Sequence, residues 1–357
     1  MLRHRRTLDR RSRPALDSLP RWEKRLVIKF RGCRVGVLCV LTFAATAACG
    51  GGSPPATDSS HLRLLSLTTL DQRVAGVADR LSRANAALCP TQRNSAGWAL
   101  HAANLYSLDL RTSAVSDFGL DGDLPGILAA PEGSAAGRAG LRTGDLILSV
   151  QGKDLERGST DAKPAYAGFA ANVGRLDDAL AQGEVEVTIR RGGARSSVTV
   201  TPERSCGYEV QLNPSDELNA RADGRRLFIS TALAGFTESD DELAVILGHE
   251  LAHNVLGHRE WDDVGGLGRS QNDTREAVDG GTGGQEQQAD RVGLYLMARA
   301  GYDPALAAPF WRRFGSSNWR VQMPQWGHAS AQTRARRLDE VRAEIEAKRS
   351  AGVALLP

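Results

Sequence analysis

The segment Ser239-Asp-Asp-Glu-Leu-Ala-Val-Ile-Leu-Gly-His-Glu-Leu-Ala-His253 carries the clearest structural signal in this chain of 357 residues. Ser239 followed three residues later by Glu242 is typical of the capping box that begins a helix. Apolar residues then recur at helical spacing, which predicts one helix running toward His258. His249 and His253 are four residues apart, so both imidazoles face the same side of that helix, with Cβ atoms about 5–6 Å apart.

Two histidines at this spacing can bind one zinc ion. Glu250 lies one step further round the helix, where it can reach a water on the metal and remove its proton. We interpret His249 and His253 as metal ligands and Glu250 as the general base. A third histidine ligand of the extended motif is excluded, because Leu256 and Arg259 stand where that motif needs glycine and histidine. The alternative is a pair of ordinary histidines on a helix surface.

A downstream glutamate is the other way to complete such a site. Glu286 and Asp290 are four residues apart at the start of a second predicted helix, which runs to Ala300 and is stopped by Gly301 and Pro304. Glu286 would complete a His-His-Glu site, and Asp290 would orient a ligand imidazole through a hydrogen bond. The alternative for Glu286 is a helix N-terminal glutamate that the helix dipole favours.

The motifs His249-Glu-Leu-Ala-His253 and Glu286-Gln-Gln-Ala-Asp290 resemble zinc metallopeptidase family forty-eight. That family includes HtpX, the CAAX prenyl proteases and periplasmic lipoprotein relatives, and the resemblance runs from about Asn219 to Leu338. It implies an α+β fold with a gluzincin-type metallopeptidase domain, helical with a small sheet. It also implies one Zn²⁺ per chain and the hydrolysis of peptide bonds by an endopeptidase.

The late segment His328-Ala-Ser-Ala-Gln-Thr-Arg334 resembles the part of the family in which arginine follows a histidine by six residues, although Ala329 replaces the family's proline. The resemblance implies that His328 stabilises the oxyanion and that Arg334 supports it. A histidine at a helix start and a solvated arginine are the alternative.

A hairpin is predicted over Asn219–Ser230 with its turn at Asp223-Gly224. Its first residues, Asn219 and Ala220, match the family's edge strand, which aligns the substrate backbone.

Three further features lie near the motif. His258 is nine residues beyond His249, about half a turn away on a continuing helix, so we interpret it as a structural or surface histidine. The segment Arg259–Gly284 holds seven glycines between the two ligand helices, and we predict that it borders the cleft as a lid. The tryptophans of the C-terminal part are expected to pack the catalytic core: Trp311, Trp319 and Trp326.

Residues 107–205 change to short strands and turns with alternating apolar residues. Within them, the segment Gly133–Gly152 resembles the PDZ domains attached to bacterial proteases. This resemblance implies a PDZ-like β-rich insertion in which Phe118, Gly119 and Leu120 hold a peptide carboxylate while the peptide adds as an extra strand. A structural spacer is the alternative.

The N-terminal region is typical of an exported protein. Residues 1–34 carry twelve basic and three acidic residues, and the uncharged run Val35–Ala48 is fourteen residues long, short of the roughly 20 that a spanning helix needs. Cys49-Gly-Gly-Gly-Ser53 then resembles a lipoprotein signal, which implies lipidation of Cys49 and a membrane anchor there. Gly50 in place of aspartate slightly favours the outer over the inner membrane. An uncleaved anchor is the alternative.

The charge and the cysteines support this reading. From Val35 onward the chain carries 33 basic and 39 acidic residues, a net charge of −6, so nucleic acid is excluded as a partner. Only Cys89 and Cys206 lie beyond the leader, on either side of the predicted insertion. In an oxidising compartment this favours a disulfide that pins the two ends of the insertion together, with two buried thiols as the alternative.

The predicted organisation is a lipoprotein leader (1–48), a flexible tether (49–65), the first part of the peptidase domain (66–106), the PDZ-like insertion (107–205) and the zinc metallopeptidase domain (206–350). We expect a periplasm-facing lipoprotein of the cell envelope that cleaves protein or peptide substrates. A peptide-binding chaperone or adaptor with a non-catalytic peptidase fold is the alternative. A third reading is an enzyme whose cleft is blocked until a peptide binds.

Overall fold

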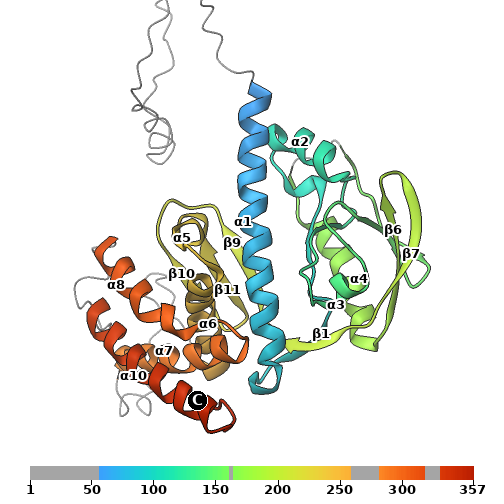
Figure 1. Ribbon diagram of the computed structural model, residues 1–357. Coiled ribbons are helices and arrows are strands. Elements are labelled where there is room, and N and C mark those ends of the chain that lie inside the picture. Colours follow the sequence, from blue (N-terminus) through green and yellow to red (C-terminus); the bar gives the residue numbers. More distant parts are fainter. Residues whose placement is uncertain (1–55, 161–163, 259–280, 318–329) are drawn as a thin grey trace, which may run out of the picture. The chain divides into compact units, whose positions relative to one another are not determined.

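The computed structural model describes residues 56–160, 164–258, 281–317 and 330–357, all within the compact unit Ser53–Pro357 (Figure 1). Helices and sheets are mixed in this unit, which confirms the mixed fold class predicted from the sequence. Across the described ranges, no helix combines the length and the apolar character that crossing a membrane requires.

Helix α1 (Ala56–Ala84) contributes to both hydrophobic cores of this unit. Leu64, near its start, is fully buried in the core of a β-rich module, whereas Val74 and Leu81 are buried in the core of a helical body. The tether predicted for residues 49–65 is therefore wrong in its second part, which is helical. The burial of Leu64 explains the difference, because tertiary packing of an apolar face stabilises a helix more than local propensity does.

The β-rich module, residues 96–200, is built on an antiparallel six-stranded sheet in the order β2-β3-β4-β6-β7, with β5 paired to β4. The strands are β2 (Ala99–His101), β3 (Gly126–Ala129), β4 (Leu146–Val150), β5 (Lys153–Asp154), β6 (Val185–Arg191) and β7 (Ala194–Val200). The helices are η4 (Ala103–Leu105), α2 (Leu108–Phe118), α3 (Ala135–Arg138) and α4 (Ala167–Gln182).

The boundary predicted at residue 107 lies too late in the chain. Strand β2 pairs with β3, with His101 opposite Gly126, so the residues before 107 already belong to the module's sheet. The reason is that β2 supplies one edge of that sheet, and a strand is stabilised by its partner rather than by its neighbours in sequence.

The helical body, residues 206–357, combines a three-stranded sheet in the order β10-β11-β9 with five α-helices among its described residues. The hairpin of β10 and β11 is antiparallel and turns at Asp223-Gly224, as predicted, whereas β9 pairs with β11 in parallel. The strands are β9 (Glu209–Asn213), β10 (Ala220–Ala222) and β11 (Arg226–Ser230). The helices are α5 (Thr231–Phe236), α6 (Asp240–Leu256), α7 (Gly281–Arg299), η5 (Pro304–Leu306), α8 (Ala307–Ser317) and α10 (Ala331–Ser350).

A two-stranded ribbon of β1 (Gln92–Ser95) and β8 (Glu203–Cys206) joins the module to the body. The turn η3 (Ala86–Leu88) leads from α1 into this ribbon. A disulfide links Cys89 and Cys206 across it, with both residues buried in the core of the body. The chain therefore enters and leaves the module at one place.

Asp71 on α1 gives a test of how tightly this helix is packed. Burial raises the pKa of its carboxyl to about 6, and its negative charge adds to the effect of burial in raising the pKa of Tyr106 in the module. The folded state thus takes up a proton at a higher pH than the unfolded state, whose carboxyl titrates near 3.8. The stability attributable to Asp71 therefore rises as the pH falls through 6 toward 4.

We expect Asp71→Asn to raise the melting temperature at about pH 7.5, and this gain to disappear near about pH 4, where the carboxyl is neutral in both states. Thermal melting of both proteins across this range measures the difference, and Asp216→Asn, at an exposed position, is the matched control. A gain for Asp71→Asn that does not depend on pH would contradict the burial of this charge.

Candidate metal centre

Helix α6 begins at a fixed position because its first turn is capped and paired. The hydroxyl of Ser239 accepts a hydrogen bond from the backbone N–H of Glu242 at 3.2 Å, as a capping residue does. The carboxylate of Glu242 accepts from the backbone N–H of Glu238 at 2.7 Å and binds the guanidinium of Arg313. The cap and the ion pair therefore fix where α6 begins and in which direction its later side chains point.

Helix α7 crosses α6 at two glycines. A Cβ atom on Gly248 would lie 2.9 Å from the carbonyl oxygen of Gly293, and one on Gly293 would lie 2.8 Å from the backbone nitrogen of His249. Both distances are too short for real contacts, so only glycine allows the two backbones to approach this closely. The close approach brings the first turns of α7 beside the histidines of α6.

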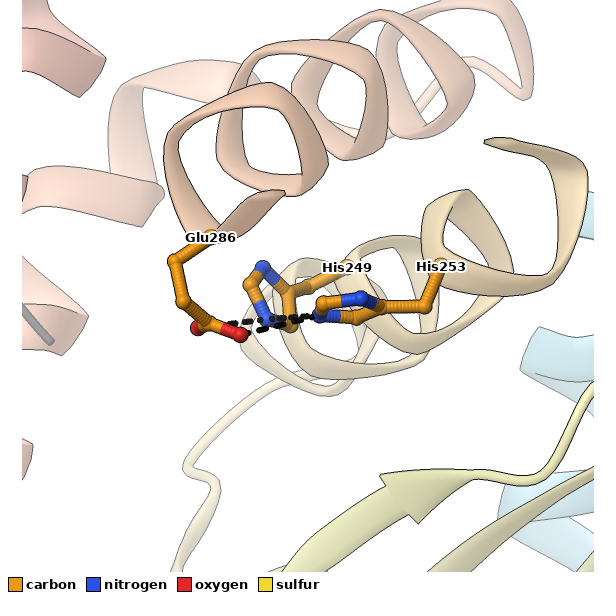
Figure 2. A group of neighbouring side chains, drawn as sticks. All are labelled: His249, His253 and Glu286. Atoms are coloured by element: carbon orange, nitrogen blue, oxygen red, sulfur yellow. Dashed lines mark hydrogen bonds and ion pairs between the residues drawn. The ribbon is translucent and has the colours of Figure 1, made fainter. Parts of the chain in front are cut away.

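Three side chains converge where the two helices meet: His249 and His253 from α6, and Glu286 from α7 (Figure 2). The Nε2 atoms of the two histidines are 3.1 Å apart. Oxygen atoms of the Glu286 carboxylate lie 3.4 Å from Nε2 of His249 and 3.3 Å from Nε2 of His253. Both histidines are buried and Glu286 is partly exposed, so the group is open on one side.

These distances fit a tetrahedral metal. Ligand atoms about 2.0–2.1 Å from a tetrahedral zinc ion lie about 3.3 Å from one another. Here the two Nε2 atoms are 3.1 Å apart, Oε1 of Glu286 lies 3.3 Å from Nε2 of His253, and Oε2 of Glu286 lies 3.4 Å from Nε2 of His249. Two imidazole nitrogens and one carboxylate oxygen are also a donor set that zinc accepts, with a fourth position left for water or substrate. Each of the three residues offers a ligand atom within 4.8 Å of the others, so the group can hold a metal ion.

Asp290 and Arg334 support the group from the side away from solvent. Nδ1 of His249 donates to the carboxylate of Asp290 at 3.0 Å, which leaves its Nε2 facing Glu286. The guanidinium of Arg334 donates to both oxygens of Asp290 and lies 3.7 Å from the carboxylate of Glu286. The structure thus brings these predicted residues together, but Arg334 is a buried partner of two carboxylates and not a solvated arginine.

Burial, ion pairs and hydrogen bonds in this cluster shift the pKa values of His249 and Asp290. Burial lowers the pKa of His249, but hydrogen bonds to Asp290 and Glu286 outweigh it and raise that pKa to about 10. Burial raises the pKa of Asp290, while Arg334 and His249 together hold it below its usual value. Without a cation the carboxylates hold a proton on His249, so a metal ion must displace that proton in order to bind.

Glu250 follows His249 on α6 and is buried as well. Burial lowers the pKa of Arg334, but the charges of Asp290, Glu286 and Glu250 outweigh it and raise that pKa, which places the carboxylate of Glu250 in the field of the same cluster. A buried carboxylate beside the metal-binding group is the arrangement that a general base needs.

Of the two predictions for His258, the structure agrees with a structural histidine and contradicts a surface one. Gly257 adopts a left-handed conformation, with φ of 70°, and ends α6, so the helix does not continue to His258 as the sequence suggested. The chain turns back instead, and His258 is buried with its Nδ1 atom 3.2 Å from Nδ1 of His253. His258 is therefore a direct neighbour of the site and not a surface histidine.

The motifs do not reveal the roles of two other residues that hold the site. Asn254 accepts a hydrogen bond from the N–H of Gly224 and donates to the carbonyl of Arg226, which ties the β10–β11 hairpin to the end of α6. Trp311 stacks against the guanidinium of Arg334 at 3.5 Å from the ring centre. Sequence reasoning placed Trp311 in the core, where it lies, but gave it no partner.

Several predicted features lie outside the described residues: Cys49, residues 259–280 of the predicted lid, Trp319, Trp326 and His328.

The predicted carboxylate loop of the module is wrong. Phe118 is the last residue of α2, and its side chain and that of Leu120 are buried in the module's core. The carbonyl of Gly119 accepts from Arg190. The next strand, β3, already pairs with β2 on one side and β4 on the other, so a peptide cannot add there. Burial of the two apolar side chains explains the difference.

Comparison with known proteins supports the class that the site suggests. Residues 181–269 match the sequence profile of Peptidase family M48, a region that includes His249, Glu250 and His253. This match and the His-His-Glu group together support a metallopeptidase.

The chain is also similar to two curated proteins, each a beta-barrel assembly-enhancing protease. Identity to the protein of Yersinia pestis is 25% over 146 residues, which covers 33% of this chain and 30% of the relative. Identity to the protein of Escherichia coli strain K12 is 27% over 132 residues, which covers 29% and 27%. The chain thus spans about 30% of the length of the curated relatives it matches.

The helix crossing can be tested with Gly293→Ala. Its methyl group would lie 2.8 Å from the backbone of His249, so we expect it to push α7 away and lower the free energy of unfolding by about 1–3 kcal/mol. Gly174→Ala in α4 is the matched control, because its Cβ would meet nothing within 4 Å, and helix propensity predicts a gain of about 0.5–1 kcal/mol. Urea unfolding measures both, and equal stability of the two variants would contradict the crossing.

Proposed function

We propose that this chain is a zinc endopeptidase of the bacterial cell envelope that hydrolyses peptide bonds in exposed or misfolded proteins. The observation that carries the proposal is the convergence of His249, His253 and Glu286 at distances that suit a tetrahedral metal. The match to Peptidase family M48 and the similarity to beta-barrel assembly-enhancing proteases support it. The name of these relatives refers to β-barrel assembly, and it suggests incompletely assembled proteins as the substrate class.

In this mechanism His249, His253 and Glu286 would hold the metal, and Asp290 keeps the ring of His249 in the orientation that presents Nε2. A zinc ion held there would polarise the scissile carbonyl and lower the pKa of the attacking water. Glu250 takes the proton from that water and later delivers it to the leaving amine.

Arg334 acts by position, because its guanidinium is already bound to Asp290 and lies beside Glu286. Its role is therefore to hold these two carboxylates in place, in keeping with the supporting role that the family resemblance implied for it. We keep His328 as the proposed group that stabilises the oxyanion.

The substrate main chain would lie along β10. This strand is an edge of the three-stranded sheet, and Asn254 of α6 binds the turn that joins it to β11. An extended peptide can pair with such an edge, which aligns its carbonyl groups with the neighbouring site.

The β-rich module would recognise peptides at an edge of its own sheet. The strands at the ends of its pairing order are β2 and β7, and these edges replace the predicted loop at residues 118–120 as the proposed place of binding. Lipidation of Cys49 would attach the chain to the outer membrane, with the described unit in the periplasm, where the disulfide between Cys89 and Cys206 is stable.

Glu250→Gln tests the mechanism. The amide cannot accept the proton of the attacking water, so we expect the rate of cleavage of fluorescently labelled casein to fall by about 10²–10⁴-fold while the zinc content stays unchanged. The control is Glu186→Gln, an exposed residue of β6, which should cleave at the wild-type rate.

Turnover by Glu250→Gln at the wild-type rate would refute the assignment. If the wild-type protein binds labelled peptides but never cleaves them, the adaptor function replaces the proposal.

A further inference from the structure

The backbone hydrogen bonds at the end of α6 bring His258 against His253. Gly257 adopts a left-handed conformation, and its N–H donates to the carbonyl of Asn254 at 3.3 Å. The N–H of His258 donates to the carbonyl of His253 at 2.9 Å. These two bonds define the helix ending in which the second residue beyond the helix packs on the last helical turn, commonly through an apolar contact.

Here that contact is made by two imidazole rings. Their centres are 5.2 Å apart and their planes are inclined by 67°. Nδ1 of His258 lies 3.2 Å from Nδ1 of His253, and Nε2 of His258 lies 3.1 Å from the side-chain oxygen of Gln288. His258 is 8% exposed, so both of its nitrogens are directed at protein groups rather than at solvent.

The groups at the two ends of this series of contacts, the metal-binding group and Gln288, decide which nitrogen donates in each hydrogen bond. Nε2 of His253 points at His249 and Glu286, so it must offer a lone pair to a metal ion, and the ring hydrogen of His253 belongs on Nδ1. That hydrogen is donated to Nδ1 of His258. The N–H of His258 is then on Nε2, where it faces the carbonyl oxygen of Gln288, which can only accept.

Gln288 lies on α7, two residues beyond Glu286. The hydrogen bonds therefore run from one proposed ligand on α6 to the helix turn that carries another. The two histidine ligands differ in the group that their Nδ1 atoms face. Nδ1 of His249 faces the charged carboxylate of Asp290, whereas Nδ1 of His253 faces the imidazole of His258.

We propose that His258 is a positioning residue of the metal site, which rests on the zinc site proposed above. It accepts the Nδ1 hydrogen of His253, fixes the tautomer and orientation of that ring, and ties it through Gln288 to the first turns of α7. Loss of such a hydrogen-bond partner outside the ligand set typically costs about 10–100-fold in metal affinity.

The test measures zinc affinity directly, by competition with a chromophoric chelator on the full chain. His258→Phe keeps a planar ring but offers no acceptor, so we expect zinc binding about 10–100-fold weaker than in the wild type. His258→Asn places an amide oxygen near the position of Nδ1, so it should restore most of the affinity. His61→Phe, at a half-exposed position on α1, is the matched control and should bind zinc as the wild type does.

Gln288→Leu provides a second variant whose folding is not at risk, because Gln288 is exposed. It removes the acceptor of the outer bond, so zinc affinity should fall by less than in His258→Phe. The metal-free forms of His258→Phe and His258→Asn should have similar melting temperatures, since we assign His258 a role in metal binding and not in the stability of the fold.

Two results would overturn the inference while leaving the proposed function intact. One is zinc binding by both His258→Phe and Gln288→Leu within about twofold of the wild type. The other is an equal loss in His258→Phe and His258→Asn, which would mean that an acceptor at the position of Nδ1 does not restore zinc affinity. Failure of the wild-type protein itself to bind zinc would overturn the metal site, and the role of His258 with it.

Discussion

The close crossing of α6 and α7 at Gly248 and Gly293 is the constraint on which the candidate site depends. Two ligands come from α6 and the third from α7, so their separation is set by how near the two backbones approach. A side chain at either glycine would push the helices apart by more than a metal centre with fixed bond lengths tolerates. The sheet, the hairpin held by Asn254 and the buried face of α1 surround this crossing and fix the helices around it.

The cluster behind the ligands adds an electrostatic constraint. Asp290 and Arg334 are both buried, and a buried ion pair stabilises a fold only when its remaining bonds are made. Here the remaining bonds go to His249 and Glu286, and Trp311 covers the guanidinium. Asp290 and Arg334 would destabilise the core if they were unpaired, and they are also the residues that orient the ligands. The metal site is therefore part of the interior of the helical body.

Much of the site could be predicted from the sequence, because helical spacing alone puts His249 near His253 and Glu286 near Asp290. The structure then brings these two pairs together. The position of His258 could not be obtained by extending the helix, since a left-handed Gly257 ends it one residue earlier. The signal was present, because glycine at that place is typical of a helix end. The module's limits were missed for a different reason, since strand pairing joins residues that are distant in sequence.

The central claim is that His249, His253 and Glu286 hold a single zinc ion. The most direct test is the metal content of the purified full chain, measured by mass spectrometry beside that of Glu286→Ala. We expect one zinc ion per wild-type chain and a large reduction in the variant, whose two remaining imidazoles cannot complete a tetrahedral site. A folded wild-type protein without bound metal, or a variant that keeps its zinc, would contradict it.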